Sequence, residues 1–120
     1  MRAIYVQQGA ALDFTPTEDV KNGEVVSLGT RIGVAAGDIP KGSTGTVHVE
    51  GVYRLAKASG EALPMGAAVC YDAAVDAITG KASVQSGEGD AAVTVNHVPA
   101  GYAAAPASAN DGTVLVKLLG

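Results

Sequence analysis

The residues best suited to chemistry in this 120-residue chain are a single cysteine and two histidines. Cys70 could act as a nucleophile if His48 or His97 lay beside it, because a neighbouring imidazole helps a thiol to ionise. The sequence alone does not bring these residues together. Val69 and Tyr71 flank the cysteine in an apolar segment. We therefore interpret Cys70 as a small apolar side chain of a strand and expect no enzymatic role.

Carboxylates are the next candidates, since paired oxygen ligands can hold a hard cation. Asp72 with Asp76, and Glu88 with Asp90, form two such pairs, but neither has the spacing of an EF-hand or of a glycine-rich calcium repeat. We expect both pairs to lie in turns, and we predict no metal site. A single cysteine also excludes an intrachain disulfide and a cysteine-based zinc site.

Two glycine-rich segments, Gly42 to Gly45 and Gly87 to Gly89, could approach a phosphate group. Neither has the arrangement of lysine and Ser/Thr found in a P-loop, or the three-glycine fingerprint of a dinucleotide site. Both are predicted to be surface turns, and no cofactor is expected.

The alternative function is that of a small all-β carrier or binding module of the biotinyl or lipoyl type. The segment 20–26, VKNGEVV, resembles the stretch of biotinyl and lipoyl carrier domains in which a glycine turn leads into a strand. Those carriers present a lysine at the tip of a tight hairpin beside methionine or aspartate. None of the lysines of this chain has such neighbours: Lys21, Lys41, Lys57, Lys81 and Lys117.

Composition limits the remaining classes. The net charge is −4, and the eight basic residues are scattered singly, whereas a nucleic-acid partner would require a basic face. No apolar stretch approaches the ~18 residues of a membrane span, and no signal peptide is recognisable. We therefore expect one soluble domain over residues 1–120, made in a reducing cytoplasm.

Short segments of strand-forming residues indicate an all-β fold. Alternation over residues 47–55 puts Val47, Val49, Gly51, Tyr53 and Leu55 on one face of a predicted strand. Another strand is predicted for Val114 to Leu118, after the turn residues 110–112. Shorter strands are predicted at residues 4–7, 24–28, 31–35, 67–71 and 92–96. Such spacing is typical of a compact small barrel or sandwich.

Helix is expected to be scarce, because no window of eleven residues keeps helical spacing without a glycine or proline. The alanine-rich run from Ala103 to Ala109 is predicted to be a loop, since Pro106 interrupts it. A weak internal similarity relates residues 20–28 to residues 63–71, with an offset of 43: apolar residue, glycine turn, strand. Duplication and shared turn chemistry explain it equally well.

The N-terminal residues 1–9 form a possible attachment arm. Ile4, Tyr5 and Val6 favour an extended strand, Gln7 can hydrogen-bond, and Gly9 provides a flexible joint. Such an arm could add a strand to the sheet of a partner protein or of a neighbouring subunit. The alternative is that this segment is the first strand of the domain's own sheet, paired with Val114 to Leu118.

Taken in order, several segments resemble a family of bacteriophage capsid cement proteins, also called head decoration proteins. They are MRAIYVQQG, LDFTPT, KNGEVVSLG, RIGVAAGDIPKGSTG, GTVHVEGVYRL, GEALPMGAAVCYDAA and NDGTVLVKLLG. Each segment consists mainly of turn glycines and strand valines, but their order and spacing make the resemblance specific. The region from Gly80 to Ala109 departs from the family pattern by a longer insertion.

The resemblance implies a structural protein of the virion that binds the outer surface of the capsid and stabilises contacts between major capsid subunits. It brings no catalytic residues. The low fraction of charged residues, 17%, agrees with a surface that contacts other proteins. A homotrimer is expected, because a cyclic trimer matches the three-fold positions of a capsid lattice.

Overall fold

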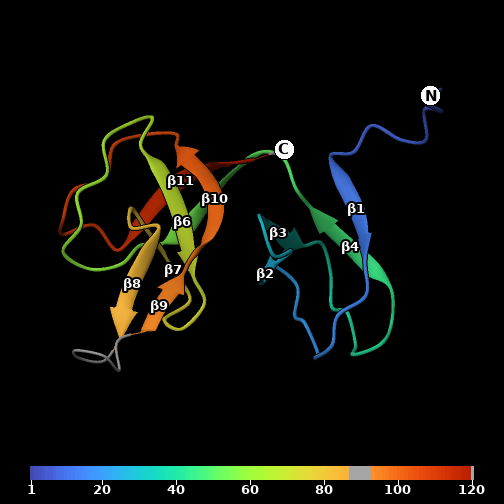
Figure 1. Cartoon of the computed structure of the whole chain (residues 1–120), viewed down its shortest axis with the longest axis horizontal. Helices are drawn as coiled ribbons and strands as arrows, with labels where there is room; N and C mark the ends of the chain where they lie inside the picture. The colour runs from blue at the N-terminus through green and yellow to red at the C-terminus, as the bar shows by residue number, and fades with distance from the viewer. Residues whose placement is uncertain (87–92, 120) are drawn as a thin grey trace.

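The computed structural model describes residues 1–86 and 93–119, and this part of the chain contains eleven strands and no helix (Figure 1). The all-β prediction is therefore confirmed. Two antiparallel sheets make up the body, and the chain completes the first sheet before it enters the second. None of the described residues forms a helix that could span a membrane.

The first sheet has the strand order β1-β4-β3-β2. Its strands are β1 (Ala11–Phe14), β2 (Val25–Ser27), β3 (Ile32–Ala35) and β4 (Gly45–His48). All neighbours are antiparallel, so that β1 and β2 form the two opposite edges.

The second sheet has the order β5-β11-β10-β6-β7. Its strands are β5 (Val52–Ala56), β6 (Ala68–Asp72), β7 (Ala77–Thr79), β10 (Val98–Ala103) and β11 (Thr113–Leu118). The edges approach each other at a single parallel bridge, Lys57 to Ile78. The sheet curls but does not close into a barrel, and the whole is sandwich-like.

A separate pair of strands, β8 (Ser83–Ser86) and β9 (Val93–Asn96), extends from the second sheet (Figure 1). It lies between Gly80 and Ala109, the region for which the resemblance predicts a longer insertion. Between β2 and β3 the chain makes only a short turn, whereas β7, β8 and β9 occupy the equivalent connection between β6 and β10.

The two sheets repeat one another. Strands β1, β4, β3 and β2 correspond in order to β5, β11, β10 and β6. Val20 and Ile39 exchange two main-chain hydrogen bonds, and Leu63 and Ala107 exchange the same two. The N–H of Gly23 bonds to the carbonyl of Ala35, as that of Gly66 bonds to Ala103.

The offset of 43 noticed in the sequence therefore corresponds to a true structural repeat. Gly23 and Gly66 both have a positive φ, 83° and 85°, at equivalent turns. Similar turn residues could explain the two turns, but they would not also produce the same strand order and the same register between neighbouring strands. Duplication is the better explanation of the similarity.

The core joins the two sheets. Ile32 and Val34 of β3 pack in one cluster with Val69, Val116 and other side chains of the second sheet. A smaller cluster around Ile39 and Val47 fills the first sheet. Because side chains of both sheets share the larger cluster, we propose that residues 10–119 fold as one unit.

The predicted strand over residues 47–55 is wrong. Val47 and Tyr53 belong to different strands, β4 and β5, in different sheets. Gly51 lies between them with a φ of 113°, a conformation that interrupts an extended strand and turns the chain toward the second sheet. The alternation of apolar and polar residues continued across the break because both strands turn their odd-numbered residues toward the core.

The remaining strand predictions are mostly confirmed, with bounds shifted by one residue or so. The alanine-rich segment after Ala103 is a loop, as predicted, and Ala107 within it bonds to Leu63. Residues 4–7 are not a strand, and β11 pairs with β5 and β10. The pairing of the N-terminal segment with Val114 to Leu118 is thus contradicted, since both sides of β11 are already occupied.

Candidate functional site

Cys70 and the two histidines do not form a nucleophilic site. Cys70 lies half-buried in β6, and burial raises the pKa of its thiol, which disfavours the reactive thiolate. His48 belongs to β4 of the other sheet. Within the described residues no hydrogen bond links Cys70 to either histidine.

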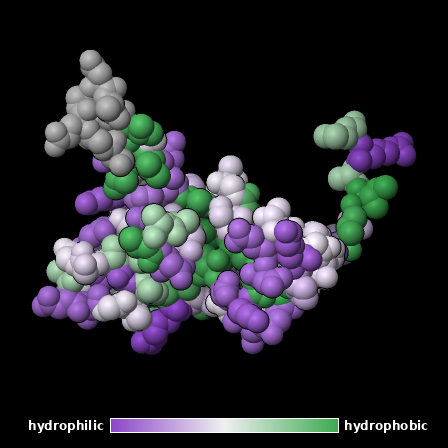
Figure 2. Space-filling model, turned by 90° about the horizontal axis from the view of Figure 1, so that it is seen from below, coloured by the Kyte–Doolittle hydropathy of each residue, from purple (hydrophilic) through white to green (hydrophobic). Residues whose placement is uncertain are grey.

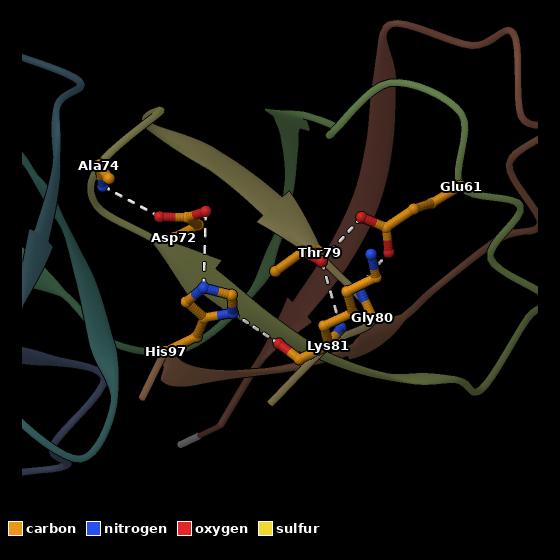
Figure 3. Close-up of polar contacts among 7 residues, drawn as sticks. All are labelled: Glu61, Asp72, Ala74, Thr79, Gly80, Lys81 and His97. Carbon is orange, nitrogen blue, oxygen red and sulfur yellow. Dashed lines mark hydrogen bonds and ion pairs between the residues drawn. The ribbon is translucent and has the colours of Figure 1, made fainter. Parts of the chain in front are cut away.

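His97 instead belongs to a buried polar network at the base of β8 and β9 (Figure 3). Its Nδ1 lies 2.7 Å from the carbonyl oxygen of Lys81. A carbonyl only accepts, so Nδ1 must carry a proton. Its Nε2 is buried without a hydrogen-bond partner among the described residues, and it faces Oδ2 of Asp72 at 3.5 Å.

Glu61 fixes the other end of this network (Figure 3). Its carboxylate accepts hydrogen bonds from the Thr79 hydroxyl at 2.8 Å and from the Gly80 N–H at 2.9 Å. The same Thr79 oxygen accepts the N–H of Lys81 at 3.1 Å. The network holds the chain rigidly where it leaves β7, and the arrangement is structural.

The remaining sequence candidates also form turn contacts. Oδ1 of Asp72 accepts the N–H of Ala74 at 3.0 Å, and Oδ1 of Asp76 accepts the Tyr71 hydroxyl at 2.6 Å. Across the described residues no group of three potential ligands could hold a metal ion. Gly42 and Ser43 form a turn closed by main-chain bonds to Pro16 and Pro40. The pair Glu88 and Asp90 and the segment Gly87 to Gly89 lie outside the described residues.

The N-terminal arm is the most exposed apolar segment. Ile4, Tyr5 and Val6 have exposed fractions of 86%, 83% and 83%. Among residues 1–86 and 93–119, the first main-chain bond of this end to the body of the protein comes at Ala10, whose carbonyl accepts the N–H of Val49. Gly9, with a φ of 84°, separates the arm from β1. The four residues predicted to make contacts are therefore available to a partner: Ile4, Tyr5, Val6 and Gln7.

A second exposed apolar group lies on β8 and β9. Val84 is paired with Val95, and Val93 lies two residues before Val95 on the same side. All three are exposed. Figure 2 shows hydrophobic groups on the arm and on this strand pair, and both project from the body toward the same side of that view. Both projections are suited to contact with another protein.

A cleft of about 600 Å³ lies beside the shared core, between the β2 edge of the first sheet and the β5–β7 side of the second. The turn before β2, the strand β5 and the β6–β7 turn line it, with Glu24, Arg54 and Asp76 as its charged groups. No pattern in the sequence indicates this cleft, because residues from three distant segments form it.

These features define a class of all-β structural proteins with exposed apolar contact segments. A comparison with family models matches residues 6–118 to the phage cement proteins. The chain belongs to this family. No curated protein and no solved structure matches it. Family membership indicates a structural, capsid-associated role in the virion, and the match leaves Ile4 and Tyr5 of the arm outside its bounds.

Proposed function

We propose that this protein binds the outer surface of the phage capsid and stabilises the contacts between major capsid subunits. Membership in the phage cement family carries this proposal. The exposed apolar side chains of the arm and of the pair β8–β9 support it, because a protein that remained free in solution would gain nothing from exposing them. The major capsid protein is the partner, and nucleic acid and membrane are not.

The arm supplies a contact, to the capsid or to a neighbouring subunit, through Ile4, Tyr5, Val6 and Gln7. Its main chain has no hydrogen-bond partner within the described residues, and unpaired strand-forming segments readily add to the edge of another sheet. Alternate side chains of such a strand enter pockets on the partner, so that Ile4 and Val6 would share one face.

A homotrimer is the proposed assembly. Three chains around a three-fold axis of the capsid would meet three equivalent surfaces at once. Linked attachment of this kind raises avidity by ~10²–10⁴ without any new type of contact. Weak single contacts would then be sufficient for stable attachment.

The protein acts without catalysis and without a cofactor. It is made in the bacterial host cytoplasm and ends on the virion surface. The carrier alternative lacks comparable support, because Lys57 is buried in the body of the protein. Intact mass after expression with biotin and lipoate ligases should equal that of the unmodified chain, and an adduct on any lysine would revive the alternative.

Binding to capsid shells that lack cement protein tests the proposal. The full chain should cosediment with shells and raise the temperature at which they release their contents. A variant in which residues 2–8 are replaced by Gly and Ser, at equal length, should keep its thermal midpoint and lose most of the binding. Absence of binding by the full chain would refute the proposed function.

A further inference from the structure

The cleft between the sheets is flanked by two strand edges whose main chains face into it. At the two ends of β2, the carbonyl of Glu24 accepts the N–H of Ala35 in β3, and the N–H of Leu28 bonds to the carbonyl of Arg31 just before β3. Because main-chain groups alternate between the two sides of an antiparallel strand, those of Val25 face away from β3. Val25 lines the cleft, and its outward groups have no hydrogen-bond partner within the described residues.

Strand β5 presents the second edge. The carbonyl of Gly51 and the N–H of Lys57 bond toward β11, and the N–H of Ala58 points the opposite way, to Ile78. The same alternation directs the main chain of Arg54 into the cleft. Arg54 also lines the cleft and, like Val25, has no partner on this side in the described part of the chain.

We propose that this cleft receives the N-terminal arm of a second copy of the chain. This inference rests on the proposed function, because it names the acceptor of the arm within the oligomer. The arm is a segment of nine residues without main-chain partners among the described residues, and when extended it is long enough to span roughly 30 Å. Its Ile-Tyr-Val sequence has strong strand propensity, and the open edges offer main-chain groups to it.

Charge complementarity favours this occupant. Arg2 is the one charged side chain of residues 1–9. The cleft carries two carboxylates, Glu24 and Asp76, against the single guanidinium of Arg54. An arm that lies in the cleft can place Arg2 near a carboxylate without burying an unpaired charge.

Sheet topology favours a second copy over the chain's own arm. The arm precedes β1, which is the edge of the first sheet opposite to β2. Figure 1 shows the N-terminus beyond β1, on the side of the first sheet that is remote from the second sheet. A head-to-tail exchange of arms closes into a ring when the rotation that relates one chain to the next is a whole fraction of a turn. A trimer, with a rotation of one third of a turn, is consistent with this.

Cross-linking of the full chain tests this arrangement. In a Cys70→Ser background, Tyr5→Cys is combined with Arg54→Cys and treated with a short bis-maleimide. Linked dimers and larger species should form on a denaturing gel. The matched control combines Tyr5→Cys with Thr17→Cys, because Thr17 is exposed and outside the cleft. Internally linked monomers alone, no linkage, or equal linkage in the control would overturn the proposal.

Sedimentation of the unlinked chain provides the second readout. Val6→Pro removes a strand N–H from the arm, and it should weaken self-association by about tenfold or more without changing the thermal midpoint. The double variant Glu24→Gln with Asp76→Asn should weaken it too. Association unchanged by Val6→Pro, or a chain that stays monomeric at every concentration, would refute the inference.

Failure of this inference is distinguishable from failure of the proposed function. A chain that binds shells as a monomer retains the proposed function and overturns the arm exchange. A chain that exchanges arms but does not bind shells supports the arm exchange and refutes the proposed function.

Discussion

Gly33 and Gly101 occupy equivalent positions in the two sheets: Gly33 pairs with Val26 of β2, and Gly101 pairs with Val69 of β6. Each lies against the next strand of its sheet. A Cβ on Gly33 would lie 3.2 Å from the Cβ of Val47, whereas one on Gly101 would lie 1.9 Å from the carbonyl oxygen of Lys117. Each copy of the repeat thus has a glycine at this equivalent position, and the glycine allows the neighbouring strand to approach closely.

Substitution of these two glycines should have unequal effects. Gly101→Ala forces main-chain displacement, because the obstacle is a backbone oxygen and the φ of 144° is strained for alanine. We expect a loss of at least about 3 kcal/mol in the free energy of unfolding, measured by urea denaturation. Gly33→Ala meets the Val47 side chain at 3.2 Å and the His48 carbonyl oxygen at 3.3 Å, tight contacts that small shifts can relieve, and it should cost about 1 kcal/mol. Equal losses would contradict this difference between the two sites.

Lys57 should be important for stability although it carries no chemistry. Its buried ammonium donates to the carbonyls of Ala58 and Glu61 at 2.8 and 2.7 Å, and it lies 3.5 Å from that of Ala109. Lys57→Met keeps the aliphatic stem but leaves these oxygens without their donor. We expect a loss of about 3 kcal/mol by thermal or urea unfolding.

Lys21→Met is the matched control for Lys57→Met, because Lys21 is exposed. It should change the free energy of unfolding by less than about 0.5 kcal/mol. Similar effects of the two variants would show that the ammonium of Lys57 is not the stabilising group.

Tyr71 should make the protein sensitive to alkaline pH. Burial, the hydrogen bond to Asp76 and nearby negative charges raise the pKa of its phenol. Above the unfolded value of about 10, the native protein still holds the proton that the unfolded chain has lost. The free energy of unfolding therefore falls as pH rises beyond about 10. Urea denaturation of Tyr71→Phe should show a shallower decline there, and an identical slope would refute this cause.

The His97–Asp72 contact predicts an uncommon effect of an isosteric substitution. With Nδ1 protonated toward Lys81, a neutral imidazole presents a lone pair to the Asp72 carboxylate. Asp72→Asn would retain the oxygen that accepts from Ala74 and add an N–H that can donate to Nε2. In mildly alkaline buffer it should raise the free energy of unfolding by about 1 kcal/mol.

Asp72→Ala is the comparison for Asp72→Asn, because it removes both contacts and should lower the free energy of unfolding. Hydrogen exchange of the amides of β8 and β9 gives a local readout. Asp72→Asn should slow it and Asp72→Ala should accelerate it. If both variants accelerate exchange equally, the charge of Asp72 is required and the tautomer argument is wrong.

The sequence by itself determined the class of fold and most of the strands. Turn glycines and prolines separate short runs of β-branched residues, and these local signals act within a few residues, so that β2, β3, β6, β9 and β11 were predictable. Strands β1, β7, β8 and β10 were missed. Ala77 and Ala100 are small residues with little strand propensity, and their burial against neighbouring strands holds them in place. The order of segments also predicted the family, which the comparison with family models confirmed.

Only the tertiary structure decided how these strands are distributed between sheets. Apolar residues alternate through Val47, Val49 and Tyr53 in the same way whether they form one long strand or two strands in different sheets. The alternation of side chains does not reveal the backbone angle at Gly51, where the two strands are separated. The repeat became unambiguous once the pairing of Val20 with Ile39 could be compared with that of Leu63 with Ala107. The cleft with Glu24, Arg54 and Asp76 depends on contacts between segments far apart in the chain, and such contacts follow from packing rather than from local sequence.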